Sequence, residues 1–113
     1  MKHRYKRYTK EQLQAEEDIL QKKLKEAEQA GKRNYVAVHR RKIEIVRSYM
    51  LDPEDFKPGD IHTLKEDPEH LHKIDEVSGV VAWGYRINKV TEEVYEDREA
   101  VLIALLGDKV VVA

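Results

Sequence analysis

The spacing of apolar residues changes in the middle of the chain, and this change limits the fold to two parts of different kinds. Before Pro53 the apolar residues recur at helical intervals, and after it they form short runs rich in β-branched and aromatic residues. Proline disfavours helical dihedrals at the preceding residue, so a helix should end near Leu51. The sequence predicts an α+β protein, with a basic arm and helical hairpin over residues 1–52 and a β domain over residues 53–113.

The first part should contain two amphipathic helices. Thr9 is a good N-cap, Gln12 completes a capping box with it, and Gly31 can end the helix in the left-handed conformation. Asn34 is the expected cap of the second helix, and a connection of about four residues makes the two helices antiparallel. The apolar stripes are Leu13, Leu20, Leu24 and Ala27 in the first helix, and Val36, Ile43, Val46 and Met50 in the second.

The second part should be a small barrel or sandwich of short strands. The expected strands are Ile61–Leu64, His70–Val77, Val80–Ile87, Val94–Arg98 and Val110–Val112. Lys65–Glu69 is expected to be an acidic loop, and Ala100–Leu106 a helical turn that ends at Gly107. By alternation Trp83 and Tyr85 share one face, where they are expected to fill the core, and Arg86 then points outward.

Composition removes several classes of chemistry. The 113 residues contain no cysteine, which excludes disulfides, thiolate nucleophiles and cysteine-based zinc or iron–sulfur sites. The longest apolar run, Val101–Leu106, is too short to cross a bilayer, and no secretory signal is expected, so the predicted location is cytoplasmic. Neither Ser48 nor Ser78 has a nucleophile-elbow context, and no phosphate-binding glycine loop is present, so we expect neither enzymatic activity nor a cofactor.

The charge is divided between the two parts. Residues 1–51 carry 14 lysines and arginines against 7 acidic residues, and residues 52–113 carry 7 against 15. Cations neutralise phosphates and release counterions, so the basic part is a candidate nucleic-acid surface. The candidate contacts are Lys2, Arg4, Lys6, Arg7, Arg40, Arg41 and Arg47. In the alternative interpretation the terminal arm is frayed or folds over the acidic part, and the two charged halves neutralise each other.

Two weaker candidate sites lie in the β part. Trp83, Tyr85 and Arg86 could form a ligand platform on the barrel surface, as an alternative to core packing. His62, His70 and His72 are weak candidates for metal ligands, since His70 and His72 alternate to one side of a strand. Packed or rim histidines are the more common outcome of such spacing, so no metal is assigned.

Several segments together resemble the YfhH-like family of small bacterial proteins. They are Arg4-Tyr5, residues 26–31, Ala37-Val38 with Arg41-Lys42, residues 48–56, Pro58-Gly59-Asp60 and residues 79–86. The resemblance covers nearly the whole chain and implies a helical hairpin followed by an SH3-like five-stranded β-barrel, on which we expect the hairpin to pack. It implies no reaction, and the role it suggests is transcription-related regulation.

Sequence and resemblance together predict a non-enzymatic binding protein that contacts nucleic acid. The alternative is a protein–protein interaction adaptor that uses the barrel and the hairpin. A nucleic acid or a protein is the expected partner and no membrane is expected, while the sequence leaves the oligomeric state and the choice between DNA and RNA open.

Overall fold

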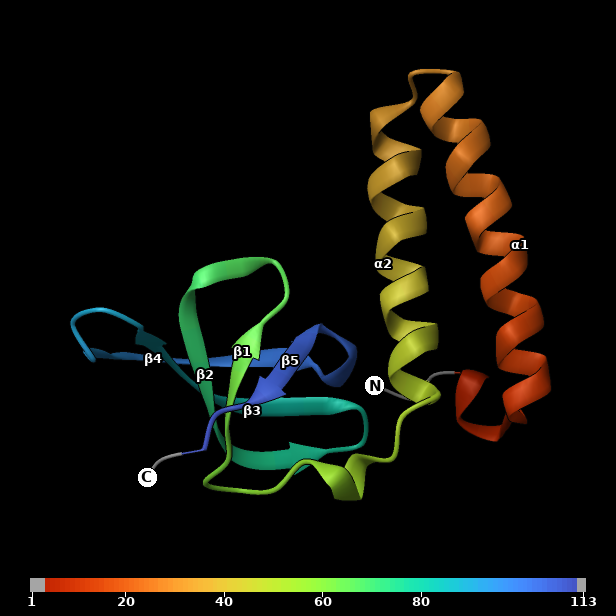
Figure 1. Ribbon diagram of the computed structural model, residues 1–113. Coiled ribbons are helices and arrows are strands. Elements are labelled where there is room, and N and C mark those ends of the chain that lie inside the picture. The colour runs from red at the N-terminus through yellow and green to blue at the C-terminus, as the bar shows by residue number, and fades with distance from the viewer. Residues whose placement is uncertain (1–3, 112–113) are drawn as a thin grey trace. The chain divides into compact units, whose positions relative to one another are not determined.

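The chain forms a helical hairpin followed by a five-stranded antiparallel sheet, which confirms the α+β class (Figure 1). The computed structural model describes residues 4–111, so Lys2 and Val112 lie outside the described residues. Two compact units divide between Leu51 and Asp52, and each is described by itself. Within the described residues, no helix is long and apolar enough to cross a membrane.

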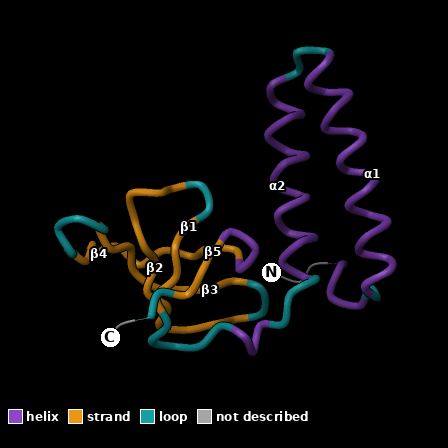
Figure 2. The backbone as a smooth tube through the Cα atoms, viewed as in Figure 1, coloured by secondary structure: helices purple, strands orange, loops and turns teal. Residues whose placement is uncertain are grey.

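The hairpin consists of the 3-10 helix η1 (Arg4–Arg7), helix α1 (Lys10–Gln29) and helix α2 (Arg33–Tyr49) (Figure 2). The predicted capping box is confirmed. The Gln12 amide donates to the Thr9 hydroxyl over 3.1 Å, and the Thr9 amide donates to the Gln12 side chain over 2.9 Å. Gly31 has the expected positive φ of 67°, immediately after the C-cap of α1.

The predicted cap of the second helix is wrong, because α2 starts earlier than expected. Its N-cap is Lys32, which makes no side-chain capping bond, and Asn34 lies inside the helix. The Lys32 amide donates to the carbonyl of Ala27 over 3.0 Å, and the Gly31 amide donates to Glu28 over 3.2 Å. This pair of bonds reverses the chain within two residues, so that no room remains for a separate cap.

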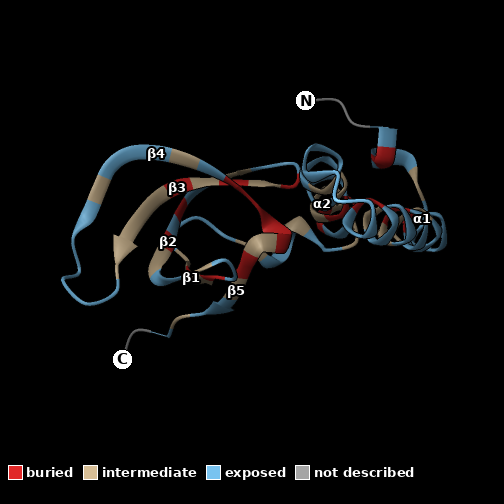
Figure 3. Ribbon diagram, turned by 90° about the horizontal axis from the view of Figure 1, so that it is seen from above, coloured by how far each residue is buried: buried red, intermediate tan, exposed pale blue. Residues whose placement is uncertain are grey.

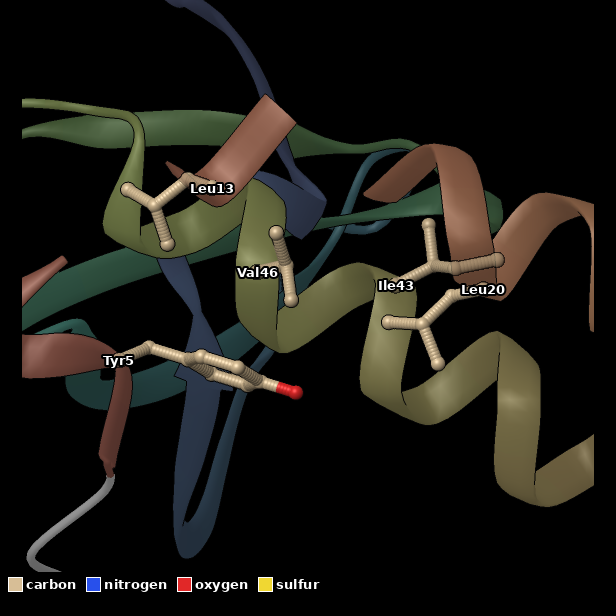
Figure 4. Close-up of a cluster of buried hydrophobic side chains, with 5 residues drawn as sticks. All are labelled: Tyr5, Leu13, Leu20, Ile43 and Val46. Atoms are coloured by element: carbon tan, nitrogen blue, oxygen red, sulfur yellow. The ribbon is translucent and has the colours of Figure 1, made fainter. Parts of the chain in front are cut away.

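The predicted apolar stripes meet in the core of the hairpin. Tyr5, Leu13, Leu20, Ile43 and Val46 form a buried cluster to which both helices and η1 contribute (Figure 4). Partly buried residues around it are Tyr8, Leu24, Ile45, Tyr49 and Met50. Full burial of an aliphatic side chain stabilises a fold by about 1.5–3 kcal/mol, so this cluster is the main source of the hairpin's stability.

The sheet has the strand order β4-β3-β2-β1-β5, and every pair of neighbours is antiparallel. Its strands are β1 (Ile61–Leu64), β2 (Asp67–Ser78), β3 (Val81–Asn88), β4 (Val94–Leu102) and β5 (Leu106–Lys109). Short 3-10 helices, η2 (Pro53–Asp55) and η3 (Ile103–Leu105), precede β1 and β5. Within the described residues the end strands β4 and β5 are not paired with each other, so the barrel closure is not confirmed.

The predicted last strand is misplaced. The helical turn expected over Ala100–Leu106 is confirmed only for residues 103–105, because β4 continues to Leu102 and β5 begins at Leu106. Val110 and Val111 lie outside β5. Leu106 is buried and pairs with Leu64, which fixes the strand there. The predicted acidic loop is also shorter than expected, because a turn at residues 65–66 already leads into β2.

Along β3 buried and half-buried segments follow each other (Figure 3), and the core of the sheet lies on the opposite face of this strand from the one predicted. Ala82 and Gly84 are buried, whereas Trp83 and Tyr85 are only half-buried, so the expectation that they fill the core is wrong. A Cβ on Gly84 would collide with the carbonyl of Lys73, so β2 and β3 come too close there for any side chain. The buried apolar residues are Leu64, Ile74, Val80, Ala82, Val101, Leu102, Ile103, Ala104 and Leu106.

Candidate functional site

Four of the five arginines predicted to contact phosphate are paired with a glutamate of the hairpin, and the fifth, Arg7, forms no ion pair within the described residues. The pairs are Arg4–Glu16 at 3.1 Å, Arg40–Glu28 at 3.4 Å, Arg41–Glu44 at 3.2 Å and Arg47–Glu17 at 3.1 Å. In each of these pairs more than half of the arginine side chain is exposed. Exposed pairs contribute only about 0–1 kcal/mol, so a phosphate can displace the glutamate, but the local field is already neutralised.

The described part of the basic arm is neither frayed nor free. Tyr5, in η1, is 2% exposed, and its ring lies 5.3 Å from Tyr8 and 6.3 Å from Tyr49 in edge-on contacts. Its hydroxyl donates to Glu16 over 3.1 Å, and burial raises the pKa of the phenol. Lys6 and Arg7 of the same turn are exposed and, within residues 4–111, form no ion pair. The arm therefore presents these two cations from a fixed position.

A groove at the tip of the hairpin gathers candidate binding side chains that were not predicted from the sequence. It has a volume of about 330 Å³ and lies between the end of α1 and the start of α2. Its lining residues are Lys23, Glu26, Ala27, Ala30, Lys32, Tyr35 and His39. We call it the tip groove. The available signal was the spacing of Tyr35 and His39, which lie four residues apart and hence on one side of α2.

Tyr35 is the central side chain of the tip groove. It is 57% exposed, although it is a large aromatic residue. The ring of His39 is nearly parallel to it, with centroids 6.5 Å apart and 22° between the planes, and the Lys32 ammonium lies 5.6 Å from its centroid. In the described part of the chain neither Lys23 nor Lys32 forms an ion pair. The groove therefore combines an exposed aromatic ring with cations that have no acidic partner.

A second groove of about 520 Å³ lies across the helix connection and is less suited to an anion. Glu28, Gly31, Arg33, Val36, Ala37 and Arg40 line it. Here Arg40 is already paired with Glu28, so Arg33 is the lining cation without an ion pair among the described residues. The lining of this second groove contains no aromatic side chain, so the groove offers no ring on which a base could stack.

The three residues of the predicted barrel platform do not share a surface. Trp83 and Tyr85 lie on one face of β3, while Arg86 lies on the other and pairs across the strands with His72. The guanidinium of Arg86 bridges Asp67 at 2.8 Å and Glu99 at 2.9 Å, so it does not point freely outward as predicted. The indole of Trp83 is covered by Arg98, at 4.8 Å from the ring centroid. Arg86 and Trp83, which lie on opposite faces of β3, are therefore both already engaged by other side chains of the sheet.

The candidate metal ligands are held in separate hydrogen bonds. Both ring nitrogens of His70 are engaged, with Nδ1 donating to Asp67 over 2.9 Å and Nε2 bonded to the Tyr95 hydroxyl over 2.9 Å. The bond from His70 is the main cause that lowers the pKa of Asp67. Among the described residues no group of three or more His, Asp or Glu side chains is placed to hold a metal ion.

His62 and His72 belong to the core of the sheet. They are 5% and 0% exposed and lie directly opposite each other on β1 and β2. His62 Nδ1 donates to the carbonyl of Gly107 over 3.0 Å, and His72 Nε2 donates to that of Ala82 over 3.3 Å. Desolvation lowers the pKa of His72, so its neutral form is favoured in the fold.

Comparison with known proteins assigns the chain to a family. It belongs to the family described as "Protein of unknown function (DUF1811)", which matches residues 3–107. A relative from Bacillus subtilis (strain 168), "Uncharacterized protein YfhH", is 38% identical over 109 residues, which cover 96% of this chain and 99% of the relative. The resemblance to the YfhH-like family is thereby confirmed.

Proposed function

We propose that this protein binds nucleic acid through the basic surface of its helical hairpin and catalyses no reaction on it. The observation that supports this most is the set of hairpin cations that, within the described residues, have no acidic partner. They are Lys6, Arg7, Lys10, Lys22, Lys23, Lys25, Lys32, Arg33 and Lys42. Phosphate contacts by such side chains release counterions, which is the main source of sequence-independent affinity.

This proposal keeps the predicted contacts Lys6 and Arg7 but replaces the paired arginines by hairpin cations without an acidic partner, most of which are lysines. An arginine that is paired with glutamate must exchange one anion for another, so its gain on binding phosphate is small. A lysine without a partner gains the full interaction. The pairs of Arg40 and Arg47 then serve mainly to join α2 to α1, whereas the pair of Arg41 with Glu44 lies within α2.

Two triple variants with equal charge change test the proposal. One replaces Lys22, Lys23 and Lys25 of α1 with glutamine, and the control replaces Lys57, Lys65 and Lys73 of the sheet unit. Each single-strand phosphate contact contributes about 0.7 to the slope of log K against log salt, so the α1 variant should lose up to about 2. The control should keep the slope of the unmodified chain. Equal slopes in the two variants would contradict the proposal.

A protein–protein adaptor is the second candidate, and one observation favours it. At the turn between β3 and β4 two apolar side chains are exposed, Val90 at 90% and Val94 at 53%. The edge strand β4 continues from there with the exposed acidic residues Glu96 and Asp97. An extended basic segment of a partner could add to such an edge. Loss of binding to a protein partner on Val90→Ser with Val94→Ser would support this function over the first.

We also propose that the sheet unit is an SH3-like barrel, as the resemblance implies. In support, β2 is 12 residues long and has a register irregularity between Ile74 and Glu76, where a strand can bend and take part in both halves of a barrel. The 3-10 turn η3 then leads β5 back to β1. We further propose that the protein acts in the cytoplasm in a process related to transcription, where DNA and RNA are available for the hairpin to bind.

A further inference from the structure

We propose that the tip groove binds an unpaired segment of nucleic acid, with one base stacked on Tyr35 and the flanking phosphates on Lys23 and Lys32. This inference rests on the proposed function and adds the class of ligand. The groove collects all three side chains from α1, the helix connection and α2.

Tyr35 has the features of a stacking platform rather than of a core residue. With 57% of it exposed, it contributes little to the buried cluster of the hairpin, which is built from other residues. His39 lies nearly parallel to the ring, with the two centroids 6.5 Å apart, and Nδ1 of His39 is buried without a hydrogen-bond partner in the described chain. An aromatic ring that is exposed to solvent can stack on a base of any sequence.

Lys23 and Lys32 line the groove together with Tyr35, where the phosphates beside a stacked base would lie. The Lys32 ammonium now lies near the ring, at 5.6 Å from its centroid, and a base would take this place while the flexible side chain turns to a phosphate. Lys42 is exposed and follows Tyr35 by seven residues, about two helical turns, so it lies on the same side of α2. From there it could contact the next phosphate along the strand. Glu26 is the acidic residue in the lining, and it opposes phosphate binding.

The exposed aromatic ring selects for unpaired bases. In a duplex the faces of the bases are covered by their neighbours, and a side chain on the surface of a helix cannot reach them without unstacking. A duplex would therefore meet the lysines alone, and its affinity would be insensitive to Tyr35. A single strand would gain the stacking contact in addition to the phosphate contacts.

The test compares Tyr35→Ala, Tyr35→Phe and the control Val38→Ala, a neighbouring exposed residue of α2 that is 47% accessible. A short labelled single-stranded RNA and its duplex are titrated by fluorescence anisotropy, with far-UV circular dichroism to show that each variant is folded. We expect Tyr35→Ala to weaken single-strand binding at least about fivefold and to leave duplex binding unchanged. Tyr35→Phe and Val38→Ala should both bind as the unmodified chain does.

Two further variants separate charge from stacking. Lys32→Gln should reduce the salt slope by about 0.7, whereas Tyr35→Ala removes no charge and should keep the slope. Glu26→Gln should tighten binding, a gain that loss of folding cannot mimic. If the unmodified chain binds the single strand and Tyr35→Ala binds it equally well, this inference is wrong while the proposed function stands. If the unmodified chain binds neither probe at low salt, the proposed function itself fails.

Discussion

Removal of the Tyr5 ring should destabilise the hairpin more than any change at an exposed position. The ring is 2% exposed and contacts Tyr8 and Tyr49, and its hydroxyl bonds to Glu16. Truncation of a buried aromatic residue to alanine costs about 3–5 kcal/mol. A hairpin of this size rarely has more than about 3–5 kcal/mol of stability, so Tyr5→Ala should leave it partly or wholly unfolded.

Tyr5→Phe separates the ring from its hydroxyl. It removes the bond to Glu16 and the bond that Arg4 donates to the phenol over 3.2 Å, but Arg4 and Glu16 remain paired with each other. We expect a loss of about 1 kcal/mol for this variant. The control Lys6→Ala changes an exposed neighbour in the same turn and should change stability by less than about 0.5 kcal/mol.

Urea unfolding with two probes measures these effects. Far-UV circular dichroism follows the helices, and the fluorescence of Trp83, the sole tryptophan, follows the sheet unit. With an m-value of about 1 kcal/mol per molar urea, Tyr5→Ala should lower the midpoint of the helical transition by about 3 M or abolish it. A helical midpoint within about 1 M of the unmodified chain would refute the packing of η1 on the hairpin.

Two predictions concern the sheet unit, both measured by Trp83 fluorescence in urea. Burial lowers the pKa of His72 below its ordinary value of 6.5, so the unfolded state binds a proton more readily, and stability should fall as the pH is lowered below 6.5. In His72→Leu this pH dependence should be weaker, and an unchanged dependence would exclude His72 as its source. Gly84→Ala should cost at least about 2 kcal/mol, because its methyl group would collide with the Lys73 carbonyl, and a smaller loss would show that the strands can separate there.

Local chemistry made the hairpin largely predictable. The capping box at Thr9 and the positive φ of Gly31 each depend on residues within three positions, which a sequence displays directly. Asn34 failed as a cap because the bonds that close the helix connection involve backbone atoms of Ala27 and Glu28. Apart from the glycine, no particular residue type is needed for such backbone hydrogen bonds, so they cannot be predicted from the sequence.

The sheet was harder to predict because its faces are set by strand contacts. Alternation placed Trp83 and Arg86 on opposite faces of β3, which is confirmed, but it does not say which face is buried. The buried face is determined by the close approach of β2 to Gly84 and by the buried apolar residues between positions 101 and 106. Both features depend on tertiary contacts.

The candidate site was missed for a related reason. The sequence shows which residues are basic but not which of them are neutralised, and two of the hairpin's pairs, Arg40–Glu28 and Arg47–Glu17, join residues of different helices. The lysines without an acidic partner can be identified only when these pairs are known. The sequence likewise does not show that Tyr35 is exposed or that Lys32 and His39 lie beside its ring.

The most direct test of the central claim is the salt dependence of binding between the full chain and a labelled single-stranded RNA, followed by fluorescence anisotropy. The account predicts binding that weakens steeply as salt rises, with a log–log slope of about −2 or steeper from three or more phosphate contacts. Absence of binding at low salt, or binding that does not change with salt, would contradict the proposal that the hairpin's lysines contact phosphates.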